Sequence, residues 1–442
     1  RFVGRVRFIA ACIALFALVL VGRLYVIQIV QGETFSERAD HQYVHAGQSL
    51  YDRGSIFFED KDGNLVSGAT LKSGFIIALN PQFIENPEST YQVLESAVKM
   101  PKEEFLKRAT KTDDPYEEVA RKVDPSVIGP IEEKEVPGVQ LFKERWRFYP
   151  GGALAAQAVG FVGYDQGDTL EGRYGLERYY EHVLSRNDSG SYVNFFAEVF
   201  GDLNKAIFER SLGEEGDLIT SIEPSVQIFL ERSLREVHST WSSAHTGGII
   251  LDPKTGEVYA LAAEPGFNAN ELEKADSAKV FSNPLVENVY EMGSIIKPIA
   301  MAAGIDAGAV TANSMYTDKG YIEVADAKIG NFDGKARGYV SMQEVLSQSL
   351  NTGMVHVVKE MGTDVFSQYL QKLAIGEETG IDLPNEAHGL VDNIKNGGPV
   401  EYATAAFGQG IALTPIATVR ALSALANGGV PVTPHLVSKI KY

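Results

Sequence analysis

The sequence predicts an α+β fold of two or three domains that follow a membrane-spanning helix at the N-terminus. The chain has 442 residues, of which 44% are hydrophobic, so it is long enough to bury more than one core. A long apolar stretch lies near the N-terminus. Behind it, short β-type runs with turn residues between them alternate with segments of helical periodicity. These features exclude a wholly disordered chain.

Residues 8–30 are the predicted membrane anchor. The run from Phe8 to Gly22 carries no charge, and apolar residues resume after Arg23. A helix that rises about 1.5 Å per residue would here cross a hydrocarbon core of about 30 Å. Three arginines lie in the preceding tail, residues 1–7, so the positive-inside rule predicts a single-pass cell-membrane protein with a cytoplasmic N-terminus and an extracytoplasmic bulk. A cleaved signal peptide is the alternative, but no small-residue cleavage site follows.

Charge and cysteine content exclude some partners and sites. The net charge of −18 argues against nucleic acid, because phosphate binding needs a basic face. Cys12 is the only cysteine, so no disulfide can form within the chain and a cysteine-rich metal site is excluded. The zinc motif HExxH is also absent from the sequence.

Behind the anchor, the sequence divides into an N-terminal domain, residues 31–212, and a C-terminal domain, residues 213–442. A cluster of glycine and acidic residues marks the boundary. In the N-terminal domain, Asp62-Gly63-Asn64 is a turn signal between two extended runs. Residues 102–122 are charged and helical in character, and we expect a solvated helix pair there.

The C-terminal domain opens with a strand, a turn and a helix. Pro224 stands where a first helical position is expected. The predicted buried face of this helix consists of Val226, Phe229, Leu230, Leu234 and Val237. Two β-type runs, residues 247–252 and 257–262, flank the turn sequence Pro253-Lys254-Thr255-Gly256 and predict an antiparallel hairpin.

Ser294 and Lys297 are the candidate nucleophile and general base. Their spacing of three places them on one face of a helix, about one turn apart. A desolvated lysine with a lowered pKa can take the proton of a serine hydroxyl and make it a better nucleophile. Pro298 is tolerated only near a helix start, which places Ser294 where the helix dipole favours developing negative charge.

The Ser-x-x-Lys pattern alone is weak, because the sequence contains it three times. Ser96 to Lys99 lies in a charged helical region and is expected at the surface. Ser438 to Lys441 has a strand pattern, which would point its serine and lysine to opposite faces. An ordinary helix-cap serine is the alternative interpretation of Ser294.

A second pattern, Ser349-Leu350-Asn351, lies 55 residues after Ser294. A second hydroxyl can relay a proton between a lysine and a leaving group, and an amide can orient the lysine or a substrate carbonyl. The alternative interpretation of this triplet is a polar loop. Ser185-Arg186-Asn187 has the same pattern but precedes every candidate nucleophile of the C-terminal domain.

Several segments resemble the penicillin-binding protein and serine β-lactamase superfamily, specifically its monofunctional class B group. In chain order they are RGSIFFEDKDG, RFYPGGALAAQAVGFVG, EGRYGLERYYEHVL, DPKTGEVYALA, YEMGSIIKP, SQSLNTG and AAFGQGIALTPIATVRALSALANGG. Their agreement in order, from the anchor to Tyr442, is more specific than any single motif. The resemblance implies an elongated α+β pedestal, which is non-catalytic and dimerisation-like, for residues 31–212. For residues 213–442 it implies a transpeptidase domain, an antiparallel sheet flanked by helices.

The resemblance also implies an activity, that of a peptidoglycan D,D-transpeptidase. Ser294 would be the acylated nucleophile and Lys297 its general base. Ser349 would shuttle a proton to the departing D-alanine, and Asn351 would hold the lysine and the donor peptide. The substrate would be the D-Ala-D-Ala end of a stem pentapeptide, and β-lactams would acylate the same serine. Neither a metal nor a cofactor would be needed.

The family's third motif, KTG or KSG, is expected after the Ser-x-Asn triplet, but neither occurs in the 91 residues that follow Asn351. Lys254-Thr255-Gly256 and Lys72-Ser73-Gly74 both precede Ser294. We interpret the first as a hairpin turn and the second as a turn before a strand. We expect the strands that complete the sheet, and one donor of the oxyanion hole, to lie beyond Tyr442, which would leave this piece a poor enzyme.

By the same resemblance, the partners would be the cell membrane, a polytopic peptidoglycan glycosyltransferase, and proteins of cell division or elongation. The division-specific branch is favoured. The alternatives are a catalytically inactive scaffold and a β-lactam sensor, against which the four intact site residues and the short cytoplasmic tail argue. A bifunctional class A protein and a secreted β-lactamase are disfavoured by the pedestal-like N-terminal domain.

Overall fold

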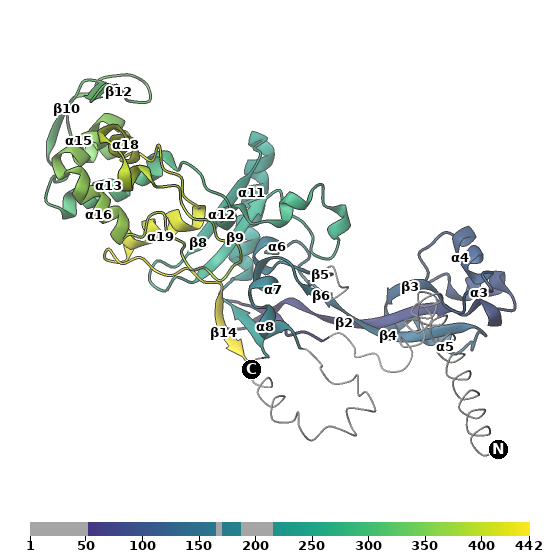
Figure 1. Cartoon of the computed structure of the whole chain (residues 1–442). Coiled ribbons are helices and arrows are strands. Elements are labelled where there is room, and N and C mark those ends of the chain that lie inside the picture. Colours follow the sequence, from purple (N-terminus) through teal and green to yellow (C-terminus); the bar gives the residue numbers. More distant parts are fainter. Residues whose placement is uncertain (1–51, 165–169, 187–214) are drawn as a thin grey trace, which may run out of the picture. The chain divides into compact units, whose positions relative to one another are not determined.

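The structure is a computed structural model that describes three stretches of the chain (Figure 1), residues 52–164, 170–186 and 215–442. These residues form two compact units. One consists of residues 72–146, and the other gathers residues 53–71, residues 147–186 and the C-terminal stretch. The predicted anchor, residues 8–30, and the predicted domain boundary at 212 and 213 lie outside the described residues. Among the residues described, no helix is long and apolar enough to cross a membrane.

The smaller unit contains the second half of strand β2 (Leu65–Leu79), with which both β3 (Glu117–Val123) and β4 (Val139–Phe148) pair. Its helices are α3 (Pro87–Leu94), α4 (Lys102–Ala109) and α5 (Gly129–Glu132). The helix pair predicted over residues 102–122 is therefore wrong in its second half, where a strand lies. The strand is fixed by its pairing with β2, and its Val119 and Val123 enter the apolar core of this unit.

In the larger unit, β1 (Ile56–Glu59) pairs in parallel with β7 (Asp217–Thr220), which pairs antiparallel with β14 (Val437–Lys441). The predicted turn at residues 62–64 is confirmed, since β1 and the start of β2 form an antiparallel pair joined there.

A buried ion-pair network joins residues 53–71 to residues 147–186 within the larger unit. Glu177, in the short helix α7 (Gly175–Tyr179), receives Arg53 Nε and Arg147 Nε, each at 2.6 Å. The side chains of all three residues are at most 1% exposed. Loss of Glu177 would leave the buried Arg147 guanidinium without this carboxylate, so the cluster holds its chain segments together.

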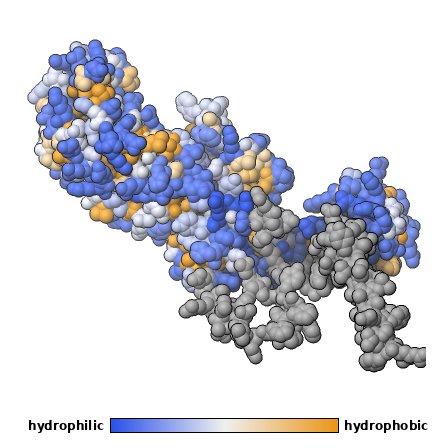
Figure 2. Space-filling view, viewed as in Figure 1, coloured by the Kyte–Doolittle hydropathy of each residue, from blue (hydrophilic) through white to orange (hydrophobic). Residues whose placement is uncertain are grey.

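The predicted helix start and hairpin of the C-terminal domain are confirmed. Helix α11 (Pro224–Trp241) has Pro224 in its first turn, and β8 (Thr246–Leu251) pairs antiparallel with β9 (Val258–Glu264). The predicted buried face is wrong in part. Phe229 and Val237 are exposed, whereas Gln227 and Glu231 are buried. Exposed apolar residues of α11 thus contribute to the hydrophobic areas of an otherwise mostly hydrophilic surface (Figure 2).

The remaining part of the larger unit is mainly helical (Figure 1). Its principal helices are α13 (Lys297–Asp306), α15 (Asn351–Met361), α16 (Thr363–Lys372), α18 (Pro399–Ala405) and α19 (Pro415–Ala426). Short strands accompany them as two antiparallel pairs, β10 (Met315–Asp318) with β13 (Gly338–Ser341) and β11 (Tyr321–Val324) with β12 (Ala327–Gly330). This mixture of helices and largely antiparallel strands is the α+β class that the sequence predicts.

Candidate active site

Ser294 lies at the start of a helical segment, as predicted. It belongs to a 3-10 turn, η6 (Gly293–Ile296), which runs directly into α13 with Pro298 in the first turn. The segment is held by its apolar side, since Ile296 and Ile299 are at most 1% exposed. Ser294 itself is exposed, whereas Lys297, one turn on, is only 2% exposed. The hydroxyl is therefore open to solvent and the amine is enclosed.

A close approach of two glycine backbones fixes the chain just before Ser294. Gly293 has φ +59° and donates its N–H to the carbonyl of Gly408 at 3.2 Å. A Cβ at Gly408 would lie only 2.1 Å from the Gly293 carbonyl oxygen, and Gly408 itself has φ +76°. Only glycine meets both requirements, the left-handed backbone and the missing side chain.

The Ser-x-Asn triplet occupies the junction of two helices. Helix α14 (Met342–Ser347) ends just before it, and α15 begins at Asn351. Leu350 is fully buried between them. Ser349 has φ +53°, a left-handed conformation that is uncommon for a residue with a side chain. Such strain persists only where the surrounding structure over-determines it, and it is concentrated at functional sites.

The structure brings all four predicted site residues together in one chain of hydrogen bonds. Lys297 Nζ lies 3.0 Å from Ser349 Oγ and 2.7 Å from Asn351 Oδ1, and it also donates to the Ser349 carbonyl at 2.6 Å. Ser349 Oγ in turn lies 3.1 Å from Ser294 Oγ. The second serine thus stands between the first serine and the lysine.

Burial lowers the pKa of the Lys297 amine from 10.5 to about 8. Within the described part of the chain, its hydrogen-bond partners are a carbonyl, a hydroxyl and an amide oxygen, and none is a carboxylate. The neutral amine is therefore accessible near neutral pH, and it can accept a proton from a hydroxyl in contact with it or through Ser349. The arrangement is able to activate a serine nucleophile and to move its proton.

The two alternative lysine triplets lie in other elements than the four predicted site residues. Lys254-Thr255-Gly256 lies in the turn between β8 and β9, as predicted. Lys72-Ser73-Gly74 lies inside β2 and not in a turn before a strand, so that interpretation is wrong. The extended pattern continues through this triplet because β2 is one long strand of 15 residues.

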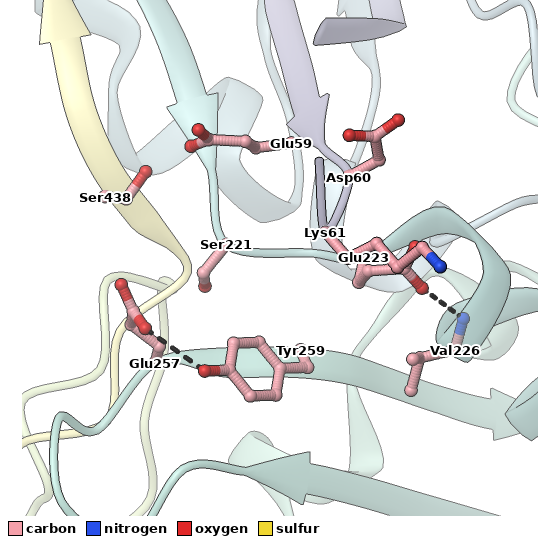
Figure 3. Close-up of a pocket in the computed structure, with 9 residues that line it drawn as sticks. All are labelled: Glu59, Asp60, Lys61, Ser221, Glu223, Val226, Glu257, Tyr259 and Ser438. Atoms are coloured by element: carbon pink, nitrogen blue, oxygen red, sulfur yellow. Dashed lines mark hydrogen bonds between the residues drawn. The ribbon is translucent and has the colours of Figure 1, made fainter. Parts of the chain in front are cut away.

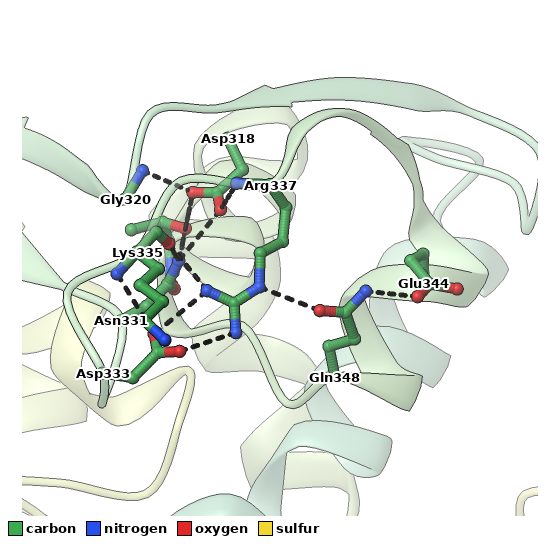
Figure 4. A network of polar contacts seen from close by, with 9 residues as sticks. Asp318, Gly320, Asn331, Asp333, Lys335, Arg337, Glu344 and Gln348 are labelled. Atoms are coloured by element: carbon green, nitrogen blue, oxygen red, sulfur yellow. Dashed lines mark hydrogen bonds and ion pairs between the residues drawn. The ribbon is translucent and has the colours of Figure 1, made fainter.

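A polar network beside the triplet was missed by sequence reasoning (Figure 4). Its centre is the buried Asp318, whose carboxyl accepts from Thr352 Oγ1 at 2.9 Å, next to Asn351 in the chain. Asn331 and Arg337 complete it. No sequence motif contains these residues, and the distance along the chain from Asp318 to Thr352 hides their contact.

A separate hollow of about 480 Å³ lies where the β1–β2 turn, the start of α11 and β9 meet (Figure 3). Its lining is acidic and contains none of the four site residues; its carboxylates are those of Glu59, Asp60, Glu223 and Glu257. Glu223 caps α11 by accepting from Val226 N at 2.7 Å, and Glu257 accepts from the Tyr259 hydroxyl at 3.4 Å. The two serines of the lining, Ser221 and Ser438, donate to backbone carbonyls, so the described contacts of the hollow are those of local structure.

Two family models match the chain. Residues 51–209 match the penicillin-binding protein dimerisation domain, and residues 246–442 match the penicillin binding protein transpeptidase domain. The second match contains Ser294, Lys297, Ser349 and Asn351.

Named relatives and one solved structure agree with these matches. Stage V sporulation protein D from Bacillus subtilis is 29% identical over 427 residues, which cover 96% of this chain and 65% of that protein. Peptidoglycan D,D-transpeptidase MrdA from Acinetobacter baumannii is 26% identical over 480 residues, covering 98% of this chain and 69% of that protein. The crystal structure of penicillin binding protein 2X from Streptococcus thermophilus matches with a TM-score of 0.70 and 22% identity, over 89% of this chain and 61% of that one. This last likeness supports the fold.

Proposed function

Because the chain belongs to the class B penicillin-binding proteins, we propose that it is a peptidoglycan D,D-transpeptidase that works through a serine acyl-enzyme. The observation that supports this most strongly is the hydrogen-bonded chain from Ser294 through Ser349 to the buried Lys297. A nucleophile, a proton relay and a base with a lowered pKa are the parts that acyl transfer by a serine requires.

In the proposed reaction, Ser294 Oγ attacks the carbonyl carbon of the penultimate D-alanine of a stem pentapeptide. Its proton passes to the neutral Lys297 amine. The tetrahedral intermediate then breaks its C–N bond, and the proton reaches the departing D-alanine nitrogen through Ser349. An amine of a second stem attacks the resulting ester, which forms the cross-link and releases Ser294 with its proton restored. The net reaction exchanges one amide for another.

Asn351 has a positioning part in this scheme. Its Oδ1 accepts from Lys297 Nζ, and its Nδ2 donates to the Gly330 carbonyl at 3.1 Å. The second bond fixes which way the amide faces, so the oxygen points to the lysine. In the presence of substrate, the same amide borders the place where the donor peptide would bind.

The proposal extends to ligands, partners and place. β-Lactams would acylate Ser294 in place of D-Ala-D-Ala. Residues 8–30 would anchor the protein in the cell membrane with the catalytic unit on the outer side. A polytopic peptidoglycan glycosyltransferase and proteins of division or elongation would be its partners, with the division-specific role favoured.

Covalent labelling of the full-length protein with a fluorescent penicillin tests the proposal. We expect labelling of the wild type and none of Ser294→Ala. The matched control is Ser96→Ala, because Ser96 heads another Ser-x-x-Lys pattern, in the smaller unit, and is exposed. That variant should label like the wild type. A folded full-length protein that takes no label at high penicillin would instead support an inactive scaffold.

A further inference from the structure

Asp318, the last residue of β10, is the centre of the network beside the Ser-x-Asn triplet. It is 1% exposed, and all its contacts are with donors. Its carboxyl oxygens accept from Gly320 N at 2.9 Å, from Arg337 N at 2.8 Å, from Asn331 Nδ2 at 3.0 and 3.1 Å, and from Thr352 Oγ1 at 2.9 Å. Asp318 touches none of the four proposed site residues in these contacts, so any effect on acylation is indirect.

One branch of the network reaches Asn351. Thr352 follows it directly and is fully buried, and the Thr352 N–H donates to Asn331 Oδ1 at 3.3 Å. Asn331 follows Gly330, whose carbonyl receives the Asn351 amide. Asp318 therefore fixes both the backbone just after Asn351 and the strand end that sets the direction of its side chain.

The other branch reaches Ser349 from its N-terminal side. Asp318 holds the backbone N–H of Arg337, and Arg337 Nε donates to Gln348 Oε1 at 2.8 Å. In Figure 4, the backbone nitrogen of Arg337 lies at the Asp318 carboxyl, and its guanidinium lies against Asp333 and Gln348. Gln348 immediately precedes Ser349, whose left-handed backbone needs support from its surroundings. The two branches hold the triplet from both ends.

We propose that Asp318 is a positioning residue for acyl transfer, which holds Ser349 and Asn351 in the arrangement that Lys297 needs. This inference rests on the proposed function. The Asn331–Thr352 branch sets the Asn351 oxygen toward the lysine, and the Arg337–Gln348 branch keeps the Ser349 hydroxyl between Ser294 and the lysine. Displacement of a reacting group by about 1 Å can reduce a rate about 100-fold, so modest loosening would be visible.

The test is the second-order acylation rate of the full-length protein by fluorescent penicillin, measured beside its thermal unfolding temperature. Asp318→Asn keeps the shape of the side chain but replaces one carboxyl oxygen with an NH2 group. The groups that donate to that oxygen then lose their acceptor. We expect acylation of this variant to fall about 10- to 100-fold, with the label still on Ser294. The matched control is Asp382→Asn. Asp382 is 6% exposed and accepts from Leu436 N, Val437 N and the Tyr180 hydroxyl, away from the triplet. It should lower the unfolding temperature and leave the acylation rate of the folded protein within about twofold.

Variants of Thr352 keep the proposal testable if Asp318→Asn folds poorly. Thr352→Val replaces the hydroxyl with a methyl group and should slow acylation about tenfold. Thr352→Ser keeps the hydroxyl, loses only the methyl group and should acylate nearly as the wild type does. In an Asn351→Ala background, Asp318→Asn should have a smaller effect than in the wild type, because the two act together.

The proposal is overturned if Asp318→Asn lowers the unfolding temperature but acylates at the wild-type rate. It is equally overturned if Thr352→Ser slows acylation as much as Thr352→Val, since then only packing matters. Failure of the wild type to label would overturn the proposed function and this inference with it. Labelling of Ser294 together with an unaffected Asp318→Asn would overturn this inference alone.

Discussion

The two motif segments of the candidate site are held in place by different kinds of contact. The segment of Ser294 and Lys297 is held by apolar packing of Ile296 and Ile299 and by the backbone contact with Gly408. The segment of Ser349 and Asn351 is held at its flanks by the polar network around Asp318. The first segment is thus positioned mainly by close packing, and the second mainly by directional hydrogen bonds.

This difference has consequences for tolerance to substitution. Apolar packing is non-directional, so a change of one methyl group is absorbed with a small loss of stability and little movement. A buried hydrogen-bond network is directional, and an unpaired member carries the full penalty of its desolvation. We therefore expect substitutions to affect mainly stability around the first segment and mainly the acylation rate around the second. Lys297, where the two segments meet, and Gly408, whose backbone contact positions Ser294, should be the exceptions.

The largest effect is expected for Lys297→Met. Loss of the base should lower the acylation rate about 10²- to 10⁴-fold, the usual range for a general base. Stability should change little, because the gain from removing a desolvated amine is offset by the loss of its three hydrogen bonds. Stopped-flow acylation and thermal unfolding of the same preparation check both parts. A variant that acylates within tenfold of the wild type would show that another group takes the proton.

The second-largest effect on the acylation rate is expected for Gly408→Ala, which disrupts the backbone contact of the first segment. The new methyl group would meet the Gly293 carbonyl and displace Ser294, and we expect about a 100-fold slower acylation. Gly428→Ala is the matched control. Gly428 also has a positive φ, +63°, but nothing lies within 4 Å of the added atom. Equal losses in the two variants would attribute the effect to backbone strain alone and contradict the close-contact explanation.

The pH profile of acylation should follow Lys297. With a pKa of about 8, the neutral fraction and hence the rate should rise through pH 8 and level off above it, and the rate at pH 6 should be about 100-fold below the plateau. The sign for stability follows from the same shift. Between about pH 8 and 10.5 the unfolded state binds more protons at this amine, so this group makes stability rise with pH in that window. A rate that is flat from pH 6 to 9 would exclude Lys297 as the base.

The smallest effect on rate is expected for Ile299→Val. This residue is fully buried beside Lys297, and loss of one methylene should lower the free energy of unfolding by about 0.5–1.5 kcal/mol. Acylation should stay within twofold of the wild type. Denaturant unfolding with parallel penicillin labelling checks both values. A large loss of rate here would remove the contrast between the two segments.

The sequence predicted the first segment well, for a local reason. Pro298 and the spacing of Ser294 and Lys297 are features of one short stretch, and local rules determine where its helix begins. Ser349 and Asn351 were identified by a second short pattern, Ser-x-Asn, 55 residues after Ser294, and the ordered landmarks of the family then supported it. The hairpin around Lys254 was predictable in the same way, because turn residues between two β-type runs are a local signal.

What the sequence did not predict depends on contacts between distant parts of the chain. Asp318, Asn331 and Arg337 carry no motif. Their roles appear only when the chain brings Asp318 and Asn331 to Thr352, and Arg337 to Gln348. The face of α11 was misassigned for a related reason. Gln227 is buried because its amide bonds both backbone groups of Leu261, and Glu231 because it accepts from Gln227 and from Ala155 N. Hydrophobic periodicity predicts which apolar residues are buried, and it cannot predict polar residues that are buried by their hydrogen bonds.

The amide of Gln227 also affects whether a further strand can pair with the sheet of β8 and β9. Its two hydrogen bonds to Leu261 lie on the edge of β9 that faces away from β8. On the same edge, Gln157 Nε2 donates to the Ala263 carbonyl, and the Glu223 N–H donates to the Tyr259 carbonyl. Two side chains and the start of a helix thus cover that edge of the strand. An extra strand, whether from a partner or from a misfolded copy, would have to break these bonds before it could pair there. Side-chain hydrogen bonds therefore protect the free edge of β9 against strand addition. Charged side chains and proline, which protect many other edge strands, have no part in these contacts.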